Sequence, residues 1–231
     1  QLCKRTGADG FMAVDTANDG DFTLHFYNAD GSRGEMCGNG SRCICRFAYE
    51  NGIAGECMTV QTDAGIVPGW RISHEQYRVQ LNLPGVLDLR RKEDVAYVEL
   101  GCPGVPHGVK EVPGLSWEQR EQREQLKPMA EALRHDPAFP KGANINLYTW
   151  LSEDSVRVLT FERGVEDYTL ACGTGTGSVA VTMFLRGQLT GNHLTAHNRG
   201  GTLAVTLGAE NGEVNSILLE GPTEIVKIYE V

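Results

Sequence analysis

Two stretches of the sequence each place a cysteine directly before a Gly-x-Gly turn. The first, GEMCGNGSRCICR, covers residues 34–46, and the second, TLACGTGTGSVAV, covers residues 169–181. Both turns run into helix-like segments, so Cys37 and Cys172 are expected at or just before helix N-termini. A helix N-terminus carries unpaired N–H groups and the positive end of the helix dipole, which together stabilise a thiolate and bind a carboxylate. Each stretch therefore predicts a reactive thiol beside a carboxylate site.

Two such thiols could invert a stereocentre if they acted on opposite faces of one carbon. One thiolate would remove a proton from one face, and the other thiol would return a proton to the opposite face. The glycines allow the backbone to approach the ligand closely. Most cysteines are small buried hydrophobic residues, and that ordinary role is expected for four others: Cys43, Cys45, Cys57 and Cys102.

Other known motifs fit the same stretches less well. Cys37-x₅-Cys43-x-Cys45 lacks the paired C-x₂₋₄-C spacing of structural zinc sites, and the sequence has no Gly-x₄-Gly-Lys-Ser/Thr phosphate loop. GTGTGS is not a dinucleotide fingerprint, because Ser178 stands in the place of the third glycine. A thiol–disulfide oxidoreductase would favour C-x-x-C, which is absent from the sequence. No metal and no cofactor are therefore expected.

The composition indicates an acidic globular protein. The 231 residues carry a net charge of −9 and are 41% hydrophobic, with no apolar run near the ~18 residues that span a bilayer. The negative charge argues against nucleic acid and anionic membrane surfaces as partners. Seven cysteines, an odd number, without a signal peptide favour a reducing cytoplasm over a disulfide framework.

The pattern of short strands and a few helices suggests an internal duplication. Runs rich in strand-forming residues predict strands at residues 22–28, 57–65, 77–85, 95–101, 144–151, 155–164, 201–208 and 216–231. Helices are predicted at 40–52, 116–136 and 176–188, and Pro128 is expected to split or kink the second. Strands, Cys-Gly-x-Gly, helix and strands occur in this order twice. The sequence therefore predicts an α+β fold of two lobes, with a seam near Arg78.

Three further segments place polar residues near predicted turns. NADGS at residues 28–32 follows a strand, and GVPHGV at 104–109 puts His107 in a glycine-rich loop. FERG at 161–164 puts adjacent Glu162 and Arg163 at a strand end. Taken alone, the histidine is expected to be structural and the Glu-Arg pair to be a surface ion pair.

Together these motifs resemble the diaminopimelate epimerase family, which comprises cofactor-independent amino-acid racemases with two catalytic cysteines. The matching segments, in family order across the chain, are GADG (7–10), NADGSRGEMCGNGSRC (28–43), VPHGV (105–109), FPKGANIN (139–146), FERGVEDYTLACGTGTGS (161–178) and GPTEIVKIYEV (221–231). Proline racemases and phenazine-pathway isomerases share the fold but differ in these motifs.

The resemblance implies two pseudo-symmetric lobes, each a mainly antiparallel strand barrel around a central helix. Residues 1–77 with 221–231 would form the lobe that carries Cys37, and residues 78–220 the lobe that carries Cys172. The two cysteines would be the acid/base pair, with His107 and Glu162 as polar partners that help to activate them. The implied substrate-binding residues are Asn28, Gly38, Asn39, Asn144, Glu162, Arg163, Gly173 and Thr174, with Arg163 on a distal carboxylate.

The sequence departs from the family in three places. The family's first strand and its G-N-D-F loop are missing, Val105 stands where many members have asparagine, and one extra residue lies between Glu162 and Cys172. The leading hypothesis is epimerisation of LL-diaminopimelate to meso-diaminopimelate for lysine and peptidoglycan synthesis. The alternatives are a racemase for another amino acid, such as histidine, and a non-catalytic amino-acid-binding relative. The expected partner is a small-molecule amino acid, and a homodimer is left open.

Overall fold

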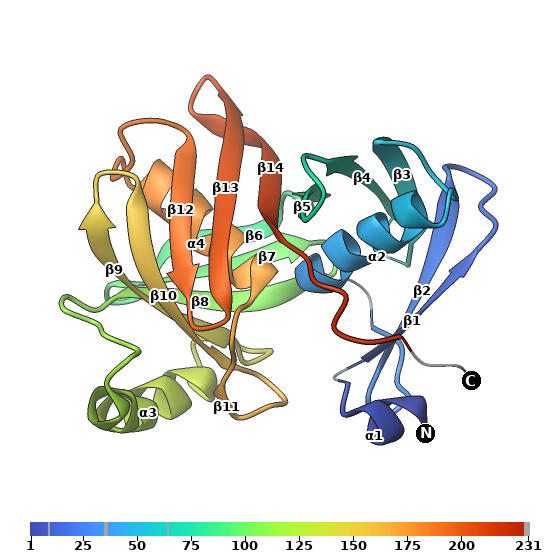
Figure 1. Cartoon of the computed structure of the whole chain (residues 1–231). Helices are drawn as coiled ribbons and strands as arrows, with labels where there is room; N and C mark the ends of the chain where they lie inside the picture. Colours follow the sequence, from blue (N-terminus) through green and yellow to red (C-terminus); the bar gives the residue numbers. More distant parts are fainter. Residues whose placement is uncertain (9, 35–36, 64, 229–231) are drawn as a thin grey trace. The chain divides into compact units, whose positions relative to one another are not determined.

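The computed structural model of the chain describes residues 1–8, 10–34, 37–63 and 65–228 (Figure 1). The chain forms two compact units, one of residues 1–80 with 220–231 and one of residues 81–219. The sequence predicted functional lobes of residues 1–77 with 221–231 and of residues 78–220, with a seam near Arg78. That division into functional lobes remains a prediction. Residues 9, 35–36 and 229–231, which belong to the motifs quoted above, lie outside the described residues.

The first unit is a five-stranded sheet with one long helix. Its elements are α1 (Leu2–Thr6), β1 (Gly10–Asp15), β2 (Phe22–Asn28), α2 (Gly38–Glu50), β3 (Cys57–Thr62), β4 (Gly65–Arg71) and β5 (Gln76–Leu81). The strand order is β1-β2-β3-β4-β5. β2 and β3 pair in parallel, and the other neighbours pair antiparallel. Helix α2 packs against β4.

Helix α2 is amphipathic, and its buried face fixes how it lies on the sheet. Arg42, Cys45 and Arg46 are buried, whereas Phe47 on the opposite face is 46% exposed. Gly69 of β4 lies directly under the helix, because a Cβ at this position would stand 2.6 Å from the Cys45 sulfur. A glycine here permits the close approach of helix and strand that seals this part of the core.

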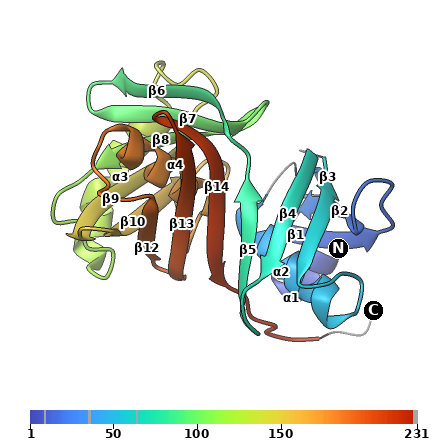
Figure 2. The same ribbon diagram turned by 90° about the horizontal axis from the view of Figure 1, so that it is seen from above.

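The second unit is a larger strand assembly around one central helix. Its elements are β6 (Pro84–Lys92), β7 (Val95–Gly101), β8 (Gly104–Glu111), α3 (Arg120–Arg134), β9 (Asn144–Ser152), β10 (Ser155–Glu162), β11 (Asp167–Tyr168), α4 (Gly173–Leu185), β12 (His193–Asn198), β13 (Gly201–Glu210) and β14 (Glu213–Pro222). The strand order is β14-β13-β12-β10-β9-β8-β7-β6, and β10–β12 and β8–β9 are its parallel pairs. Helix α4 lies between strands β6–β8 and strands β12–β14 (Figure 2).

Helix α4 is enclosed on all sides. Every residue from Gly173 to Met183 is buried, and the helix packs against β7, β8, β9, β12 and β13. Two of its buried hydroxyl groups find acceptors within the helix itself. Thr176 Oγ1 donates to the Cys172 carbonyl and Ser178 Oγ to the Thr174 carbonyl, each at 2.9 Å. A helix that is buried on every face in this way is a fixed support for whatever lies at its N-terminus.

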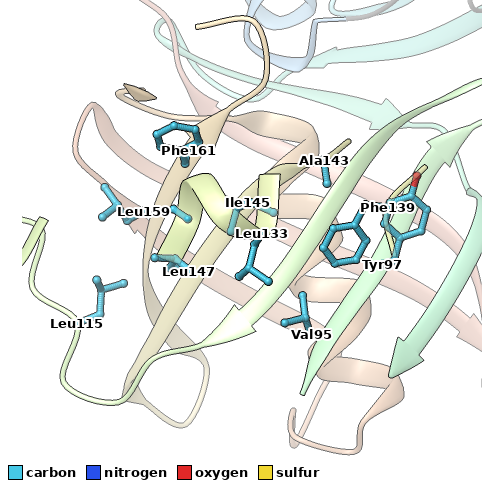
Figure 3. Packing of buried hydrophobic residues seen from close by; sticks show 11 residues of the cluster. Val95, Tyr97, Leu115, Leu133, Phe139, Ala143, Ile145, Leu147, Leu159 and Phe161 are labelled. Carbon is cyan, nitrogen blue, oxygen red and sulfur yellow. The ribbon is translucent and has the colours of Figure 1, made fainter. Parts of the chain in front are cut away.

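A separate hydrophobic cluster fills the space between α3 and the outer face of the strands (Figure 3). It joins Leu133 of α3 to Ile145 and Leu147 of β9 and to Leu159 and Phe161 of β10. Successive strand residues point to opposite faces, so the alternate β9 residues Asn144 and Asn146 face α4. Strand β9 thus separates an apolar core from a polar face.

The observed elements correct several sequence predictions. Helix α3 is continuous over Arg120–Arg134, so Pro128 does not split it. Pro128 and Glu124, whose carbonyl loses its intrahelical N–H partner, are both exposed, and water can take the place of the missing donor. The last strand ends at Pro222, so the prediction that it continues to residue 231 is wrong for the described part. Among the described helices, none has the length and apolar character needed to cross a membrane.

Candidate active site

Cys37 caps helix α2 at its N-terminus. Its backbone is extended, with φ −133° and ψ 107°, and its sulfur accepts a hydrogen bond from the Gly40 N–H at 3.3 Å. The Cys37 carbonyl accepts the Ser41 N–H at 2.8 Å, which is the first bond of the helix. The thiol therefore lies among the N–H groups of the first turn, where a negative charge is stabilised.

A cavity opens beside this thiol within the first unit. Its lining joins Cys37 and Ser41 to side chains of three strands and to one glycine: Met12, Leu24, Phe26, Thr62 and Gly34. Most of these groups are apolar. Electrostatic interactions of the thiol are stronger in such surroundings than they would be in water.

The first turn of α2 is held in place by Arg42. Its Nη1 donates to the Gly38 carbonyl at 3.1 Å, and its Nη2 donates to Asn39 Oδ1 at 3.2 Å. Gly38 and Asn39 are the residues that the family resemblance assigns to the carboxylate cradle. Arg42 was not among the residues predicted from the sequence, although its place on the same face as Ser41 and Cys45 could have marked it as buried.

Asn28 ends strand β2 in a closed polar turn. Its Nδ2 donates to Ser32 Oγ at 3.0 Å, and its backbone N–H donates to the Ser32 carbonyl at 2.9 Å. The Asp30 carboxylate accepts both the Ser32 hydroxyl and the Ser32 N–H, and these two hydrogen bonds lower the pKa of Asp30. The turn leaves Asn28 exposed, with its side-chain amide bonded to a neighbouring hydroxyl.

Cys172 caps helix α4 with nearly the same geometry. Its backbone angles are φ −122° and ψ 114°, and its sulfur accepts the Gly175 N–H at 3.4 Å. The side chain is buried, and Thr174 Oγ1 lies 3.6 Å from the sulfur. All seven cysteines of the chain, Cys37 and Cys172 included, are thiols in the structure.

A hydrogen-bonded chain leads from Cys172 to the strands behind it. The Thr174 hydroxyl lies 3.0 Å from His107 Nε2, and His107 Nδ1 lies 3.2 Å from the amide nitrogen of Asn146. An amide nitrogen only donates, so Nδ1 accepts, and the imidazole proton sits on Nε2 and points to Thr174. The Thr174 hydroxyl hydrogen is then available for the sulfur of Cys172.

The orientation of the Asn146 amide is fixed by its other neighbours. Nδ2 lies 3.1 Å from the Gly108 carbonyl and 3.3 Å from the Asn144 carbonyl, and both are acceptors. Oδ1 accepts the Thr160 hydroxyl at 3.0 Å from the neighbouring strand. A flipped amide would place oxygen against two carbonyl oxygens, so only this orientation satisfies the network. Asn146 was not among the predicted site residues. The alternation Asn144, Ile145, Asn146 was the available signal.

The environment of His107 determines its charge. The side chain is completely buried, and this burial lowers its pKa to about 3, with a further contribution from the positive charge of Arg163. His107 is therefore neutral at physiological pH, and it reaches Cys172 through Thr174 as an oriented hydrogen-bond donor.

The segment that carries Glu162 and Arg163 is anchored to strand β9. The Arg163 N–H donates to Asn144 Oδ1 at 2.8 Å, and Arg163 Nη1 donates to the Lys141 carbonyl at 2.9 Å. Glu162 is partly buried at the end of β10, where its carbonyl accepts the Glu166 N–H at 2.8 Å. Arg163 as a whole is exposed.

A neighbouring lysine has its charge compensated. Lys141 Nζ contacts the buried Glu99 carboxylate at 2.7 Å, and Tyr97 donates its hydroxyl to the same carboxylate at 2.6 Å. Burial raises the pKa of Glu99, but the hydrogen bonds from Lys141 and Tyr97 outweigh it and the pKa is lowered. Arg163 is thus better placed than Lys141 to bind an incoming carboxylate.

The structure joins the predicted residues into two groups, one in each unit. Cys37, Gly38 and Asn39 form the first turn of α2, with Arg42 behind them. Cys172, Gly173 and Thr174 form the first turn of α4, with His107 and Asn146 behind them. Within the described residues, no group of three or more His, Cys, Asp or Glu side chains has an arrangement that could hold a metal ion.

The sequence is similar to those of many curated proteins. The family model described as diaminopimelate epimerase matches residues 3–82 and 103–226. The chain is 35% identical to the diaminopimelate epimerase of Aquifex aeolicus, over 97% of this chain and 79% of the relative. It is also 35% identical to the diaminopimelate epimerase of a Hydrogenobaculum species, over 100% of this chain and 83% of the relative.

Solved structures share the fold at low sequence identity. A PhzF-family phenazine biosynthesis protein of Bacillus anthracis superposes with a TM-score of 0.68 at 16% identity, covering 96% of this chain and 84% of that protein. A probable proline racemase of Agrobacterium radiobacter gives a TM-score of 0.65 at 18% identity, covering 92% of this chain and 72% of that protein. These similarities confirm the predicted α+β fold class with two lobes. The sequence matches go further and establish that the chain belongs to the diaminopimelate epimerase family.

Proposed function

We propose that the chain interconverts LL- and meso-diaminopimelate by a cofactor-independent, two-base mechanism, and so supplies lysine and peptidoglycan synthesis. The observation that carries the proposal is the pair of cysteine caps. Cys37 and Cys172 each hold their sulfur against an N–H group of a helix's first turn, at 3.3 and 3.4 Å. Membership in the diaminopimelate epimerase family supplies the substrate, since the relatives bear that name.

In the proposed reaction the substrate α-carboxylate binds the first-turn N–H groups. The thiolate of one cysteine removes the α-proton, and the electron pair of the broken C–H bond moves into the carboxylate. The first turns, at Gly38 with Asn39 and at Gly173 with Thr174, would stabilise the charge that develops there. The thiol of the other cysteine then donates its proton to the opposite face of the carbon. The mechanism requires both sulfurs at one carbon.

The remaining predicted residues take supporting roles in this proposal. His107 and Glu162 would favour the reactive state of the thiols, and for His107 this would act through the hydroxyl of Thr174, 3.0 Å from its Nε2. Asn28, Asn144 and Arg163 would bind the substrate. The exposure of Arg163, which is anchored by its backbone to Asn144, supports its role on the distal carboxylate. Since reduced thiols are the active form, we also propose a cytoplasmic location; a homodimer stays a prediction, to be tested by light scattering.

A racemase for another amino acid is the second candidate, and Val105 is the observation that favours it. Val105 lies at the start of β8, where its apolar side chain cannot provide the hydrogen bonds of the asparagine expected from the family. A substrate with fewer polar groups would tolerate this change better than diaminopimelate.

Hydrogen exchange in deuterated water tests both candidates. The reduced protein is incubated separately with LL-diaminopimelate, L-lysine and L-histidine, and each product is analysed by mass and by chiral chromatography. We expect one deuterium and inversion at one centre of diaminopimelate, with little reaction of the two monocarboxylates. Racemisation of histidine or lysine with diaminopimelate untouched would refute the substrate assignment, whereas the two-thiol mechanism would stand. No exchange with any amino acid would support a non-catalytic relative.

A further inference from the structure

Arg42 is a buried cation whose hydrogen-bond partners are neutral. Its side chain belongs to a residue that is 4% exposed, and its two terminal nitrogens donate to the Gly38 carbonyl and the Asn39 amide oxygen. Among the described residues, Nε has no hydrogen-bond partner and no carboxylate pairs with the guanidinium. A buried charge of this kind is costly unless an opposite charge lies nearby.

Arg46, one turn further along the same helix, shows the usual arrangement. It is buried to a similar degree, at 7% exposed, but its Nε contacts the Glu50 carboxylate at 2.8 Å and its Nη1 donates to the Thr223 carbonyl at 2.7 Å. The difference between the two arginines lies in the partner and not in the burial. Arg46 has a carboxylate partner, whereas the hydrogen-bond partners of Arg42 are neutral.

Among the described residues, the ionisable groups that act on the charge of Arg42 are three cysteine thiols. Burial lowers the pKa of Arg42, and the charges of three neighbouring thiol groups act in the opposite direction: Cys43, Cys37 and Cys45. The strands around the Cys37 cavity contribute Met12, Leu24, Phe26 and Thr62, none of which ionises. Arg46 is the other described cation that acts on this cluster, through Cys43, and its own charge is paired with Glu50.

Among the three thiols, Cys37 is the one positioned to ionise. Cys43 is exposed at the surface, but partial desolvation of its thiol raises its pKa, and burial raises the pKa of Cys45 to about 12, so both remain protonated. Both also lie beyond the first turn of α2, where the N–H groups are used by the helix itself. Cys37, by contrast, holds its sulfur against the Gly40 N–H. The charge of Arg42 and the helix terminus thus act together on one sulfur.

We propose that Arg42 is the buried counter-charge of Cys37 and holds this cysteine as a thiolate in the resting protein. Arg42 is then a positioning residue that acts through Cys37 and through the Gly38–Asn39 turn that it braces. The inference rests on the proposed catalytic role of Cys37. Arg42 would then be the source of the thiolate's stability. The proposal involves no covalent or redox step.

The test measures ionisation of Cys37 directly, without substrate. In the full chain carrying Cys172→Ser, the rate of iodoacetamide alkylation of Cys37 is followed by peptide mass mapping from pH 5 to pH 10. The same profile is recorded with Arg42→Gln, Arg42→Met and Arg42→Lys. Arg46→Gln is the matched control, because it removes a buried arginine of the same helix that already has a carboxylate partner. Circular dichroism checks that each variant is folded.

We expect Arg42→Gln and Arg42→Met to raise the midpoint of the profile by about one pH unit. The rate at pH 7 should fall by roughly two- to fivefold, because the parent is already largely thiolate at that pH. Arg46→Gln should leave the midpoint in place. An Arg42→Gln profile equal to that of its parent would overturn the proposal, as would a parent midpoint at or above the ordinary cysteine value of about 8.5.

If the neutral variants fail to fold, Arg42→Lys decides, because it keeps the charge but not the forked hydrogen bonds. A midpoint that stays low supports the counter-charge, and one that rises to about 8.5 overturns it. The outcome is also separate from the proposed function. A chain that epimerises diaminopimelate with an unchanged Arg42→Gln profile refutes this inference alone, and a shifted profile in a chain without epimerase activity refutes the function alone.

Discussion

Cys37 and Cys172 occupy the same position on two helices of opposite character. Helix α2 is amphipathic and has one exposed face, and the group that braces its first turn is the charged side chain of Arg42. Helix α4 is buried on all sides, and its cap is supported by neutral groups, Thr174 of the first turn and His107 behind it. The cap geometry itself hardly differs, with sulfur to N–H distances of 3.3 and 3.4 Å.

The comparison shows that one local motif can be supported in two physically different ways. At Cys37 a buried charge acts on the thiol, and this effect depends on proximity more than on orientation. At Cys172 a hydroxyl must point at the sulfur, and this depends on a fixed histidine tautomer and on Asn146. A fully enclosed helix suits the arrangement at Cys172, because a hydrogen bond from an oriented hydroxyl group weakens when the helix that carries it moves.

The largest expected effect tests whether the two supports serve the same chemistry. Cys37→Ala and Cys172→Ala should each lower diaminopimelate epimerisation by about 10²–10⁴-fold or more, because each face of the carbon needs its own acid/base group. The measurement is inversion by chiral chromatography together with deuterium uptake. Cys57→Ala, which removes an exposed cysteine, is the control. Near-normal epimerisation by either active-site variant would show that one thiol suffices.

The next largest effect concerns Arg163 in the second unit. We propose that Arg163 binds the substrate, whereas Arg42 in the first unit acts on a thiol. Arg163→Met should lower kcat/KM for diaminopimelate by roughly 30-fold or more, since losing a charged hydrogen bond costs about 2–5 kcal/mol and 1.4 kcal/mol is a factor of ten. The matched control is Arg199→Met, because Arg199 is also exposed and donates to a backbone carbonyl, that of Tyr168. Equal kinetics for the two variants would remove Arg163 from the substrate site.

A third prediction compares the second glycine of each Cys-Gly-x-Gly turn. A Cβ at Gly175 would stand 2.2 Å from Asn146 Oδ1, whereas one at Gly40 would meet the flexible Met12 side chain at 3.0 Å. Gly175→Ala should therefore be less stable than Gly40→Ala by about 1–3 kcal/mol in urea unfolding, because the Asn146 network must move. The gain in helix propensity is shared and cancels in the difference. Equal stabilities of the two variants would mean that the hydrogen-bond network behind Cys172 accommodates an added methyl group at little cost in free energy.

The sequence was sufficient for the parts of this comparison that depend on local chemistry. Cys-Gly-x-Gly followed by a helix-like segment predicted both caps, and the order of motifs predicted the family and the fold class, which the sequence matches and solved structures confirm. The roles of the individual site residues stay predictions. Asn146 was missed because its importance arises from β8, β10 and α4, which meet it only in the folded chain.

Two of the strands that were not predicted from the sequence share a physical cause. Strand β4 contains Pro68 and Gly69, and β8 contains Pro106 and Gly108, so both are rich in residues that normally interrupt strands. The glycines are needed for packing: a Cβ at Gly108 would stand 2.8 Å from the Ile145 side chain. Requirements of this kind come from neighbouring elements and cannot be read from a strand alone.

The smallest expected effect tests whether the support behind Cys172 is really neutral. Burial lowers the pKa of His107 to about 3, below the ordinary value of about 6.5. Above pH 6.5 the histidine is neutral in both the folded and the unfolded chain, so it adds no pH dependence. Below pH 6.5 His107 binds a proton in the unfolded chain but not in the folded chain. The free energy of unfolding therefore falls by about 1.4 kcal/mol per pH unit until the pH approaches 3.

His107→Gln makes this contribution measurable against the other titrating groups. The free energy of unfolding in urea is determined for the parent and the variant at pH 7.5 and pH 5.5, and the difference between them should shift by about 1.4 kcal/mol, in favour of the variant at the lower pH. The exposed His74 provides the control variant, His74→Gln, which should show no such shift. A parent and a His107→Gln variant with the same pH dependence would mean that His107 takes up its proton in the folded chain. The imidazolium would then be a buried cation beside Thr174, and the two cysteine caps would rely on the same kind of support after all.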